Sequence, residues 1–227
     1  MQKQELASSA ALRETMVERQ IRTFDVTDAG VLARMKATPR EFFVDPNLVS
    51  LAYSDACLTV TGVSPRELTA PLILARMLKE ARIRAGEHVL VVAGASGYAA
   101  ALIAGLAGSV VSLDCDEKLT ELARGNFAAL SLANAKAVTG PLEQGAPAEA
   151  PFDLIVVDGV SQGSFDPLLK QLRADGRLVG IVADRPGARS GTATLVQRAG
   201  DHFSARGLFD ASAGGLPAFG KPVAFVF

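Results

Sequence analysis

One segment, His88–Asp116, limits the possible folds of this chain more than any other part of it: HVLVVAGASGYAAALIAGLAGSVVSLDCD. Its pattern predicts a buried strand, a tight turn containing Gly94 and Gly97, an apolar helix, and a second strand that ends in acidic residues. This order is typical of the nucleotide-binding half of a doubly wound α/β fold. Ala93 and Ala95 stand where a phosphate-binding turn often has glycine. The segment therefore predicts a cofactor domain with an unusual turn.

Length and composition narrow the class of protein. A chain of 227 residues with 49% hydrophobic residues is large enough for one domain with a sizeable core. The charges of the 23 basic and 24 acidic residues nearly cancel. Without a strong net positive charge, we expect neither nucleic acid nor an anionic membrane as a partner. The N-terminal residues lack the apolar core of a signal peptide, and no apolar run reaches membrane-spanning length.

The few cysteines and histidines restrict the possible chemistry. Cys57 and Cys115 have no metal-ligand spacing, and they fit a reduced, cytoplasmic setting. With His88 and His202 as the two histidines, a histidine-based triad or a multi-histidine zinc site is hard to build. We therefore expect a cytoplasmic protein without a bound metal.

The first third of the chain has helical patterns. Apolar spacing predicts helices over Ser8–Arg22, from Thr27 to Pro39, and over Leu68–Ala81. Thr27 and Thr69 are the expected N-caps of the second and third helices, because their hydroxyl groups can accept a backbone hydrogen bond. The stretch Phe42–Gly62 is irregular, and whether Phe42–Leu68 folds over a site as a lid is left open.

From His88 onward the pattern alternates between strands and helices. The expected strands are Val89–Ala93, Val110–Leu113, Ala135–Thr139, Leu154–Asp158 and Leu178–Val182. The expected helices are Tyr98–Leu106, Glu117–Leu130 and Phe165–Ala174. Strands made almost wholly of Val, Ile and Leu predict a doubly wound, mainly parallel sheet with helices on both faces. Alternating patterns at Phe203–Phe209 and Val223–Phe227 predict a C-terminal antiparallel hairpin.

No repeat or linker divides the chain. We expect a single domain over residues 1–227, in which 1–84 form a helical N-terminal extension with a substrate-side loop and 85–227 form the cofactor-binding α/β core.

The turn after the first strand carries the candidate cofactor residues. A strand that feeds a helix N-terminus presents free backbone N–H groups, and glycine lets a ligand approach them, which selects Gly94 and Gly97. Asp114 ends the next strand 20 residues after Gly94 (114 − 94), where an acidic residue accepts hydrogen bonds from a ribose diol. The alternative is that these are ordinary turn glycines and a solvated strand-end aspartate.

Two further stretches indicate the cofactor. PFDLIVVDG (Pro151–Gly159) reads as a strand that ends in an acid, and LLKQLRADGRLVGIV (Leu168–Val182) as a helix, a turn and another strand. Followed by a hairpin, this arrangement resembles the class I fold of methyltransferases that use S-adenosylmethionine.

The N-terminal region narrows the resemblance. Met16–Leu48, Leu51–Leu58 and Leu68–Ala81, which include MVERQIR and LTAPLILARMLKEA, resemble the protein-L-isoaspartate O-methyltransferase family. The similarity continues through VLVVAGASGY, PFDLIVVDG and ADGRLVGIV and so covers nearly the whole chain.

The resemblance implies transfer of a methyl group from S-adenosylmethionine to isoaspartyl residues of proteins or peptides. A carboxylate acceptor with a pKa of about 4 is ionised at neutral pH, so it needs no general base. The family's hydroxyl-bearing loop corresponds to SPRELTAP (Ser64–Pro71), which implies that Thr69 holds the substrate carboxylate. Arg66 could pair with that carboxylate, whereas Glu67 would repel it. Gly94, Ser96, Gly97 and Asp114 are the implied cofactor-binding residues.

Departures from the family pattern keep two alternatives open. Val91 replaces the family's acidic residue on the first strand, and Pro141 lies where the family has an acid that contacts adenine. Each missing charge-assisted hydrogen bond could cost about 1.5–3 kcal/mol of cofactor binding. One alternative is therefore a weak or inactive protein of methyltransferase fold that acts by binding. The other is an O-methyltransferase with another acceptor, in which Asp158 ligates a metal.

Overall fold

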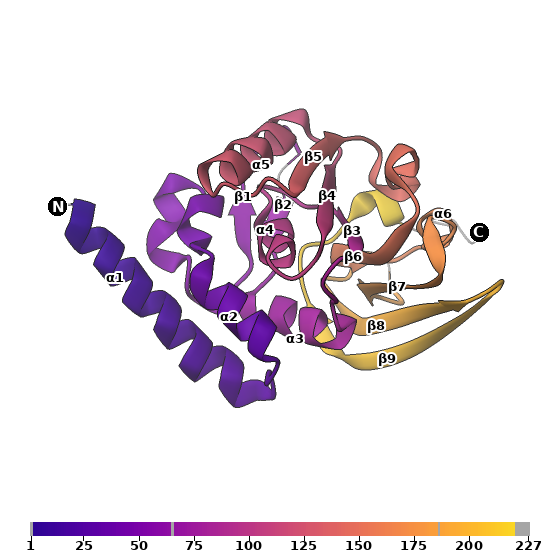
Figure 1. Ribbon diagram of the computed structural model, residues 1–227, viewed down its shortest axis with the longest axis horizontal. Helices are drawn as coiled ribbons and strands as arrows, with labels where there is room; N and C mark the ends of the chain where they lie inside the picture. Colours follow the sequence, from indigo (N-terminus) through magenta and orange to yellow (C-terminus); the bar gives the residue numbers. More distant parts are fainter. Residues whose placement is uncertain (1, 65, 186, 221–227) are drawn as a thin grey trace, which may run out of the picture.

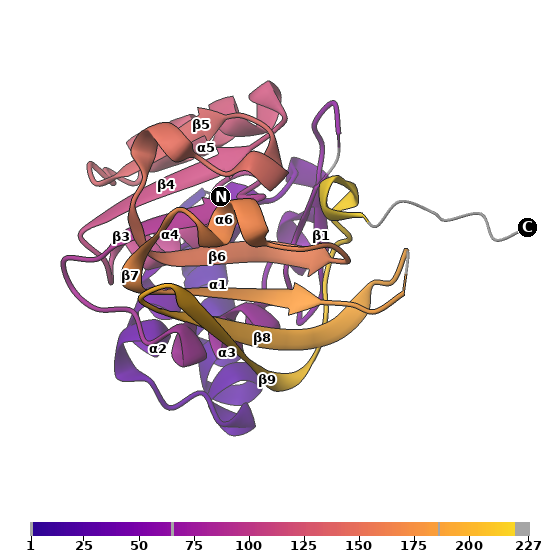
Figure 2. The same ribbon diagram turned by 90° about the vertical axis from the view of Figure 1, so that its right-hand side faces the viewer.

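The computed structural model describes residues 2–64, 66–185 and 187–220. Within them, seven strands form one sheet in the order β5-β4-β3-β6-β7-β8-β9 (Figure 2). The strands are β3 (His88–Val92), β4 (Ser109–Asp114), β5 (Ala135–Thr139), β6 (Phe152–Ser161), β7 (Leu172–Val182), β8 (Ser190–Ala199) and β9 (His202–Ser212). The five strands from β3 to β7 are mutually parallel, whereas β8 pairs antiparallel with β7 and β9 pairs antiparallel with β8. The predicted fold class is confirmed.

Alternate side chains of the central strands supply two hydrophobic clusters, one on each face of the sheet. Val89 and Val91 join the first cluster, whereas Leu90 and Val92 join the second. Helices α3 (Pro71–Ala81), α4 (Tyr98–Ala104) and α5 (Glu117–Ala129) pack against the first cluster. Short helices cover the second: η5 (Leu142–Gln144), α6 (Asp166–Leu169) and η7 (Pro217–Phe219). Both faces of the parallel sheet are thus buried, which explains the near-continuous apolar strands.

The N-terminal third packs onto the first cluster. Its elements are α1 (Gln2–Thr15), the π-helix η1 (Met16–Ile21), η2 (Arg22–Phe24), α2 (Ala29–Ala37), η3 (Arg40–Phe43), η4 (Pro46–Leu51), and the small hairpin of β1 (Leu58–Val60) and β2 (Arg66–Leu68). Figure 1 shows α1 extending along one side of the molecule. Met16 and Ala213 belong to the same hydrophobic cluster, so residues from both predicted parts of the chain share one core. The single-domain organisation stays a prediction. Among the described helices, none is both long enough and apolar enough to cross a membrane.

Three predicted helix boundaries were wrong. The first helix starts at Gln2, and its last turns widen into a π-helix and then tighten into a 3₁₀ turn. Asp28 caps α2 in place of Thr27, because its carboxylate accepts from the Val31 N–H at 2.8 Å. Helix α3 begins at Pro71 with Ala70 as its N-cap, because the preceding residues pair as β2. Thr69 is therefore not a helix cap.

The last third differs from prediction in two places. The predicted helix Phe165–Ala174 is limited to α6, because Leu172 already pairs with Phe152 and β7 begins there. The C-terminal hairpin is formed by β8 and β9, which pair up to Ala199 and His202 across a turn at Gly200 (φ 62°). The stretch Val223–Phe227, predicted as the second hairpin strand, lies outside the described residues.

A buried ion pair links the start of β3 to β7 and α3. Arg177 donates to both carboxylate oxygens of Glu87 at 2.9 Å, and also to the backbone carbonyls of Ala81 and Arg82. Burial raises the pKa of Glu87, but the Arg177 guanidinium together with the backbone N–H and charge of Arg84 holds that pKa below its usual value. The pair lies at the amino end of the sheet, away from the site described next.

Candidate active site

The candidate site lies at the carboxyl ends of β3, β4 and β6. The strand order reverses at β3, because β4 lies on one side of it and β6 on the other, and ligands of such sheets bind where the order reverses. Val92 pairs with Leu113 of β4 and with Val157 of β6. One residue further along each strand come Ala93, Asp114 and Asp158. Two aspartates therefore flank the end of β3, and we call this place the switch-point edge.

The turn after β3 is fully buried, and its glycines are required by packing. A Cβ at Gly94 would lie 2.0 Å from Ser112 Oγ, and one at Gly97 (φ +96°) would lie 2.6 Å from the Phe127 ring. Ala93 and Ala95 adopt left-handed φ values of 62° and 49°, which glycine adopts more readily. The turn therefore keeps the shape of a glycine turn with fewer glycines.

Ser96, predicted to bind cofactor, faces the N-terminal region. Its hydroxyl donates to the Phe43 carbonyl at 2.5 Å, and its own carbonyl accepts from Asn126 Nδ2 at 2.9 Å. Ser96 thus ties η3 and α5 to the turn. Phe43 and Asn126 could not be predicted as partners from the sequence, since they lie 53 and 30 residues away.

Asp114 lies where a diol-binding acid is expected, and its carboxylate already has partners. It accepts from the backbone N–H groups of Ala95 and Asp116, both at 3.1 Å. Its Oδ2 also accepts from Arg66 Nε at 3.3 Å, and Arg66 Nη2 contacts Cys115 Sγ at 2.8 Å. Arg66 was expected to pair with a substrate carboxylate, and in the structure it pairs with Asp114.

The β1–β2 hairpin therefore covers part of the switch-point edge. The Ser64 N–H donates to Asp116 at 2.7 Å, and Arg66 reaches inward to Asp114. A cavity of about 190 Å³, the Asp158 cavity, lies on one side; it is lined by Arg66, Glu67, Asp158, Arg189, Gly214, Gly215 and Leu216. A second cavity, of about 430 Å³, is lined by Val63, Ser64, Cys115, Asp116, Glu117, Lys118 and Glu121. Because Arg66 lines the first and contacts Cys115 in the second, its side chain stands at the boundary between them.

Thr69 and Arg40 form a buried polar cluster beside Asp158. Thr69 is 1% exposed, and its carbonyl accepts from Arg40 Nη2 at 3.1 Å. The fully buried Arg40 guanidinium lies 4.7 Å from the centre of the Tyr98 ring. The Thr69 hydroxyl lies close enough to the Asp158 carboxyl group to lower its pKa, but among the described residues neither the hydroxyl nor Asp158 Oδ1 has a partner in full hydrogen-bond geometry. Arg40 lies in no sequence motif from which a role in a site could have been predicted.

Asp158 is a buried carboxyl group with a perturbed pKa. Burial raises its pKa from 3.8 to about 6, and the nearby Thr69 hydroxyl and Arg40 guanidinium oppose this rise. The register between β6 and β7 shifts between Val156 and Val160, so Asp158 lies in a β-bulge. No group of three or more His, Cys, Asp or Glu residues able to hold a metal occurs in the described parts of the chain. The metal-ligand role considered for Asp158 therefore finds no partner ligands there.

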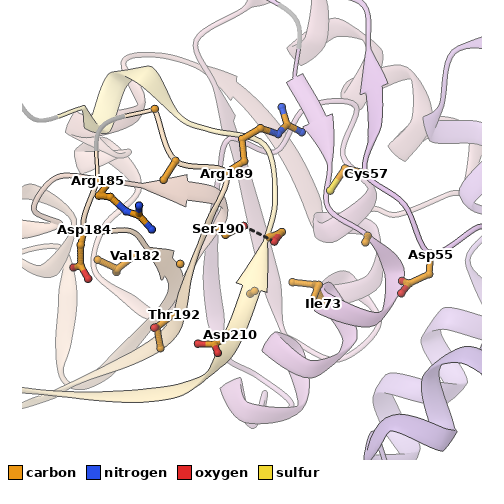
Figure 3. A pocket seen from close by; sticks show the side chains of 16 residues that line it. Asp55, Cys57, Ile73, Val182, Asp184, Arg185, Arg189, Ser190, Thr192 and Asp210 are labelled. Carbon is orange, nitrogen blue, oxygen red and sulfur yellow. Dashed lines mark hydrogen bonds between the residues drawn. The ribbon is translucent and has the colours of Figure 1, made fainter.

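A large cavity of about 1110 Å³ adjoins the Asp158 cavity, since Arg189 lines both. Figure 3 shows its charged side chains on separate walls: Asp184 and Arg185 come from the end of β7, Asp55 from the loop before β1, and Asp210 from β9. Glu67, which was expected to repel a substrate carboxylate, is paired with Arg189. Its charge is therefore neutralised at the boundary between the two cavities.

Sequence comparisons agree on one family. The model of the protein-L-isoaspartate(D-aspartate) O-methyltransferase family matches residues 11–205. A protein-L-isoaspartate O-methyltransferase from Methanoculleus marisnigri is 40% identical over 173 residues, which cover 76% of this chain and 78% of that relative. Another, from Burkholderia pseudomallei strain 668, is 38% identical over 192 residues, which cover 84% of this chain. The chain spans little more than half of that relative, 58% of its length.

Solved structures share the fold. A protein-L-isoaspartate O-methyltransferase superposes with a TM-score of 0.80 at 22% identity, covering 92% of this chain and 67% of that one. A putative protein-L-isoaspartate O-methyltransferase from Plasmodium falciparum, in complex with S-adenosyl-L-homocysteine, gives a TM-score of 0.73 at 19% identity, covering 90% and 97%. At such identities the likeness establishes the fold.

Proposed function

Because this chain belongs to the protein-L-isoaspartate(D-aspartate) O-methyltransferase family, we propose that it transfers a methyl group from S-adenosylmethionine to the carboxylate of isoaspartyl residues in proteins or peptides. The observation that carries the proposal is the Thr69 hydroxyl, which is buried at the switch-point edge and has no partner in hydrogen-bond geometry among the described residues. A buried hydroxyl without a partner is costly unless a ligand supplies one. An acceptor carboxylate would be that partner.

The residues at the switch-point edge fit the cofactor, provided that Arg66 moves. Bound S-adenosylmethionine would supply an electrophilic methyl group on a positively charged sulfur. Asp114 would accept from its ribose hydroxyls in place of Arg66, while the buried turn at Gly94 and Gly97 would form the floor beneath it. Ser96 would act indirectly, because its hydroxyl is engaged with Phe43 and holds η3 on the turn.

The acceptor side needs orientation rather than proton transfer. An isoaspartyl carboxylate is ionised at neutral pH, so attack on the methyl group depends on positioning and on the exclusion of water. The Thr69 hydroxyl would donate to this carboxylate, and Arg40 fixes the Thr69 backbone through its carbonyl. The polar walls of the large cavity would face the flanking peptide. Two free cysteines support a reduced, cytoplasmic location as part of the proposal.

Replacing Thr69 with alanine should lower kcat/KM for an isoaspartyl peptide about 10- to 100-fold, since a hydrogen bond to a charged group contributes about 1.5–3 kcal/mol. The Thr69→Ser variant should keep most of the activity. The measurement is methyl transfer from labelled S-adenosylmethionine to an isoaspartyl peptide, with the matching aspartyl peptide as control. S-adenosylhomocysteine affinity should stay within about threefold of wild type, because Thr69 touches the acceptor. Equal loss of turnover and of cofactor affinity contradicts the assigned role, and no transfer by the wild type overturns the proposed function.

Replacing Arg66 with alanine should tighten binding of S-adenosylhomocysteine about three- to tenfold, because the ribose no longer competes with the guanidinium for Asp114. Isothermal titration calorimetry measures this directly. The matched control is Arg189→Ala, because Arg189 pairs with Glu67, a residue of the same hairpin as Arg66. This variant should leave the affinity unchanged. Weaker binding by Arg66→Ala would mean that Arg66 helps to hold the cofactor.

The Arg66–Asp114 ion pair also favours a second candidate function, a protein of this fold that acts by binding alone. In that case Arg66 fills the ribose position permanently. The same titration separates the two functions, because a binding-only protein of this kind takes up no S-adenosylhomocysteine at millimolar concentration.

A further inference from the structure

One buried carboxyl group, that of Asp158, lacks a matching positive charge. The side chain is 4% exposed, and Oδ1 has no hydrogen-bond partner among the described residues. A buried ionised carboxylate is unfavourable unless a cation or several donors face it. The group is placed where a ligand can reach it, since Asp158 lines a cavity of about 190 Å³ at the switch-point edge.

The other charges around this cavity are already neutralised. Arg66 pairs with Asp114, and Arg189 pairs with Glu67. Arg40 is close enough to affect Asp158 electrostatically, but it makes no ion pair with it and donates to the Thr69 carbonyl instead. With Arg66 and Arg189 paired as they are in this structure, Asp158 is the anionic group of the cavity that has no ion-pair partner in the described part of the chain.

The fold keeps Asp158 at this place by two devices. The β-bulge between Val156 and Val160 takes Asp158 out of the regular ladder with β7. The C-terminal segment then closes the far side, because the Val160 N–H donates to Gly214 at 2.7 Å and the Leu216 N–H donates to Val160 at 2.9 Å. A side chain at Gly159 would collide with this segment, with a Cβ 2.7 Å from Leu216 Cγ.

We propose that Asp158 is the anionic group that binds the positively charged sulfur of S-adenosylmethionine, a role that rests on the function proposed above. Ala93 lies between Asp114 and Asp158 at the edge, so a cofactor held by its ribose at Asp114 extends across the end of β3 toward Asp158. The attraction is strong because the site is buried and its local dielectric constant is low. After methyl transfer the sulfur is neutral, so Asp158 favours the methyl donor over the demethylated product.

The test compares two ligands that differ in charge at this atom. S-adenosylhomocysteine has a neutral thioether sulfur, whereas sinefungin has a carbon bearing a protonated amine at the same position. Calorimetry on the wild type should give at least tenfold tighter binding of sinefungin. In Asp158→Asn, which preserves shape and removes the charge, the two affinities should become equal within about threefold. Affinity for S-adenosylhomocysteine itself should hardly change.

Controls separate this inference from the proposed function. Asp184→Asn removes an exposed acid that follows the neighbouring strand β7, and it should leave the affinity ratio unchanged. An unchanged ratio in Asp158→Asn, or an equal loss of both ligands, overturns the inference while cofactor binding stands. If the wild type binds neither ligand, the proposed function itself is overturned.

A pH titration of the wild type provides a measurement that needs no variant. The charged groups that face Asp158 are Arg40, Arg66, Glu67 and Arg189, the Cys57 thiol is a nearby titratable group, and Thr69 faces Asp158 with a hydroxyl. Because the pKa of Asp158 is about 6, its carboxylate is ionised above that pH and neutral below it. The preference for sinefungin should therefore be full at pH 8 and fall toward unity by about pH 5. A ratio that is constant over this range contradicts the role of Asp158.

Discussion

Replacing Arg177 with methionine should lower the free energy of unfolding by about 3–5 kcal/mol, because it leaves the Glu87 carboxylate buried without its partner. The carbonyls of Ala81 and Arg82 lose their donor at the same time. Urea denaturation monitored by circular dichroism measures the loss. Arg173→Met is the matched control: Arg173 pairs with Asp153 at 3.0 Å, but its side chain is 49% exposed, so about 1 kcal/mol or less is expected.

The same pair predicts a pH dependence of stability. The pKa of Glu87 lies below its usual value of 4.5, so the folded state binds this proton more weakly than the unfolded chain does. The contribution of the pair is therefore complete above about pH 4.5 and is lost as the pH falls through the lower folded-state pKa. In Arg177→Met this acid-side loss should disappear. Similar stability losses for Arg173→Met and Arg177→Met would show that burial does not distinguish the two pairs.

Replacing Asp114 with asparagine should weaken binding of S-adenosylhomocysteine at least 100-fold. Two ribose hydroxyls would each lose a charge-assisted hydrogen bond of about 1.5–3 kcal/mol, and about 1.4 kcal/mol corresponds to tenfold in affinity. The control is Asp116→Asn, since the Asp116 carboxylate accepts from the backbone N–H groups of Ser64 and Lys118. It should change the affinity by less than about threefold.

Combining Asp114→Asn with Arg66→Ala tests whether both act at the same place. If Arg66 weakens cofactor binding by occupying Asp114, its removal should have no further effect once the Asp114 charge is gone. The two changes should therefore be non-additive in a double-mutant cycle. Additive effects, or a less than threefold loss for Asp114→Asn alone, would place the ribose elsewhere.

The fold was largely predictable because its central strands are nearly uninterrupted runs of Val, Ile and Leu. Such runs identify buried parallel strands without knowledge of their partners, and β5 was predicted with its observed bounds. Errors arose where long-range pairing decides the local structure. Leu172 lies in a helix-like sequence, but its pairing with Phe152 makes it the start of β7. For the same reason the helix predicted over Leu68–Ala81 begins only at Pro71, because Leu68 belongs to β2 and pairs with β1.

The sequence indicated where two candidate residues lie but not their electrostatic partners. Asp114 ends β4 at the switch-point edge and Thr69 lies beside Asp158, while their roles toward cofactor and acceptor stay predictions. The partner of Arg66 was not predictable, because the contact with Asp114 spans 48 residues and depends on how the β1–β2 hairpin folds over the edge. The unpaired state of Asp158 depends likewise on where Arg40, Arg66 and Arg189 find their partners.

The wall of the Asp158 cavity also bears on synthesis of the protein. Gly214, Gly215 and Leu216 form part of that wall, and in the chain they follow all the strands of the sheet that the structure describes. During translation these residues leave the ribosome after β9, although a domain generally folds as a unit. A nascent chain that ends before this wall also lacks Leu216 and Phe219, which belong to the second hydrophobic cluster, and it leaves Asp158 open to solvent. The segment that follows β9 therefore completes the Asp158 cavity and the second hydrophobic cluster together.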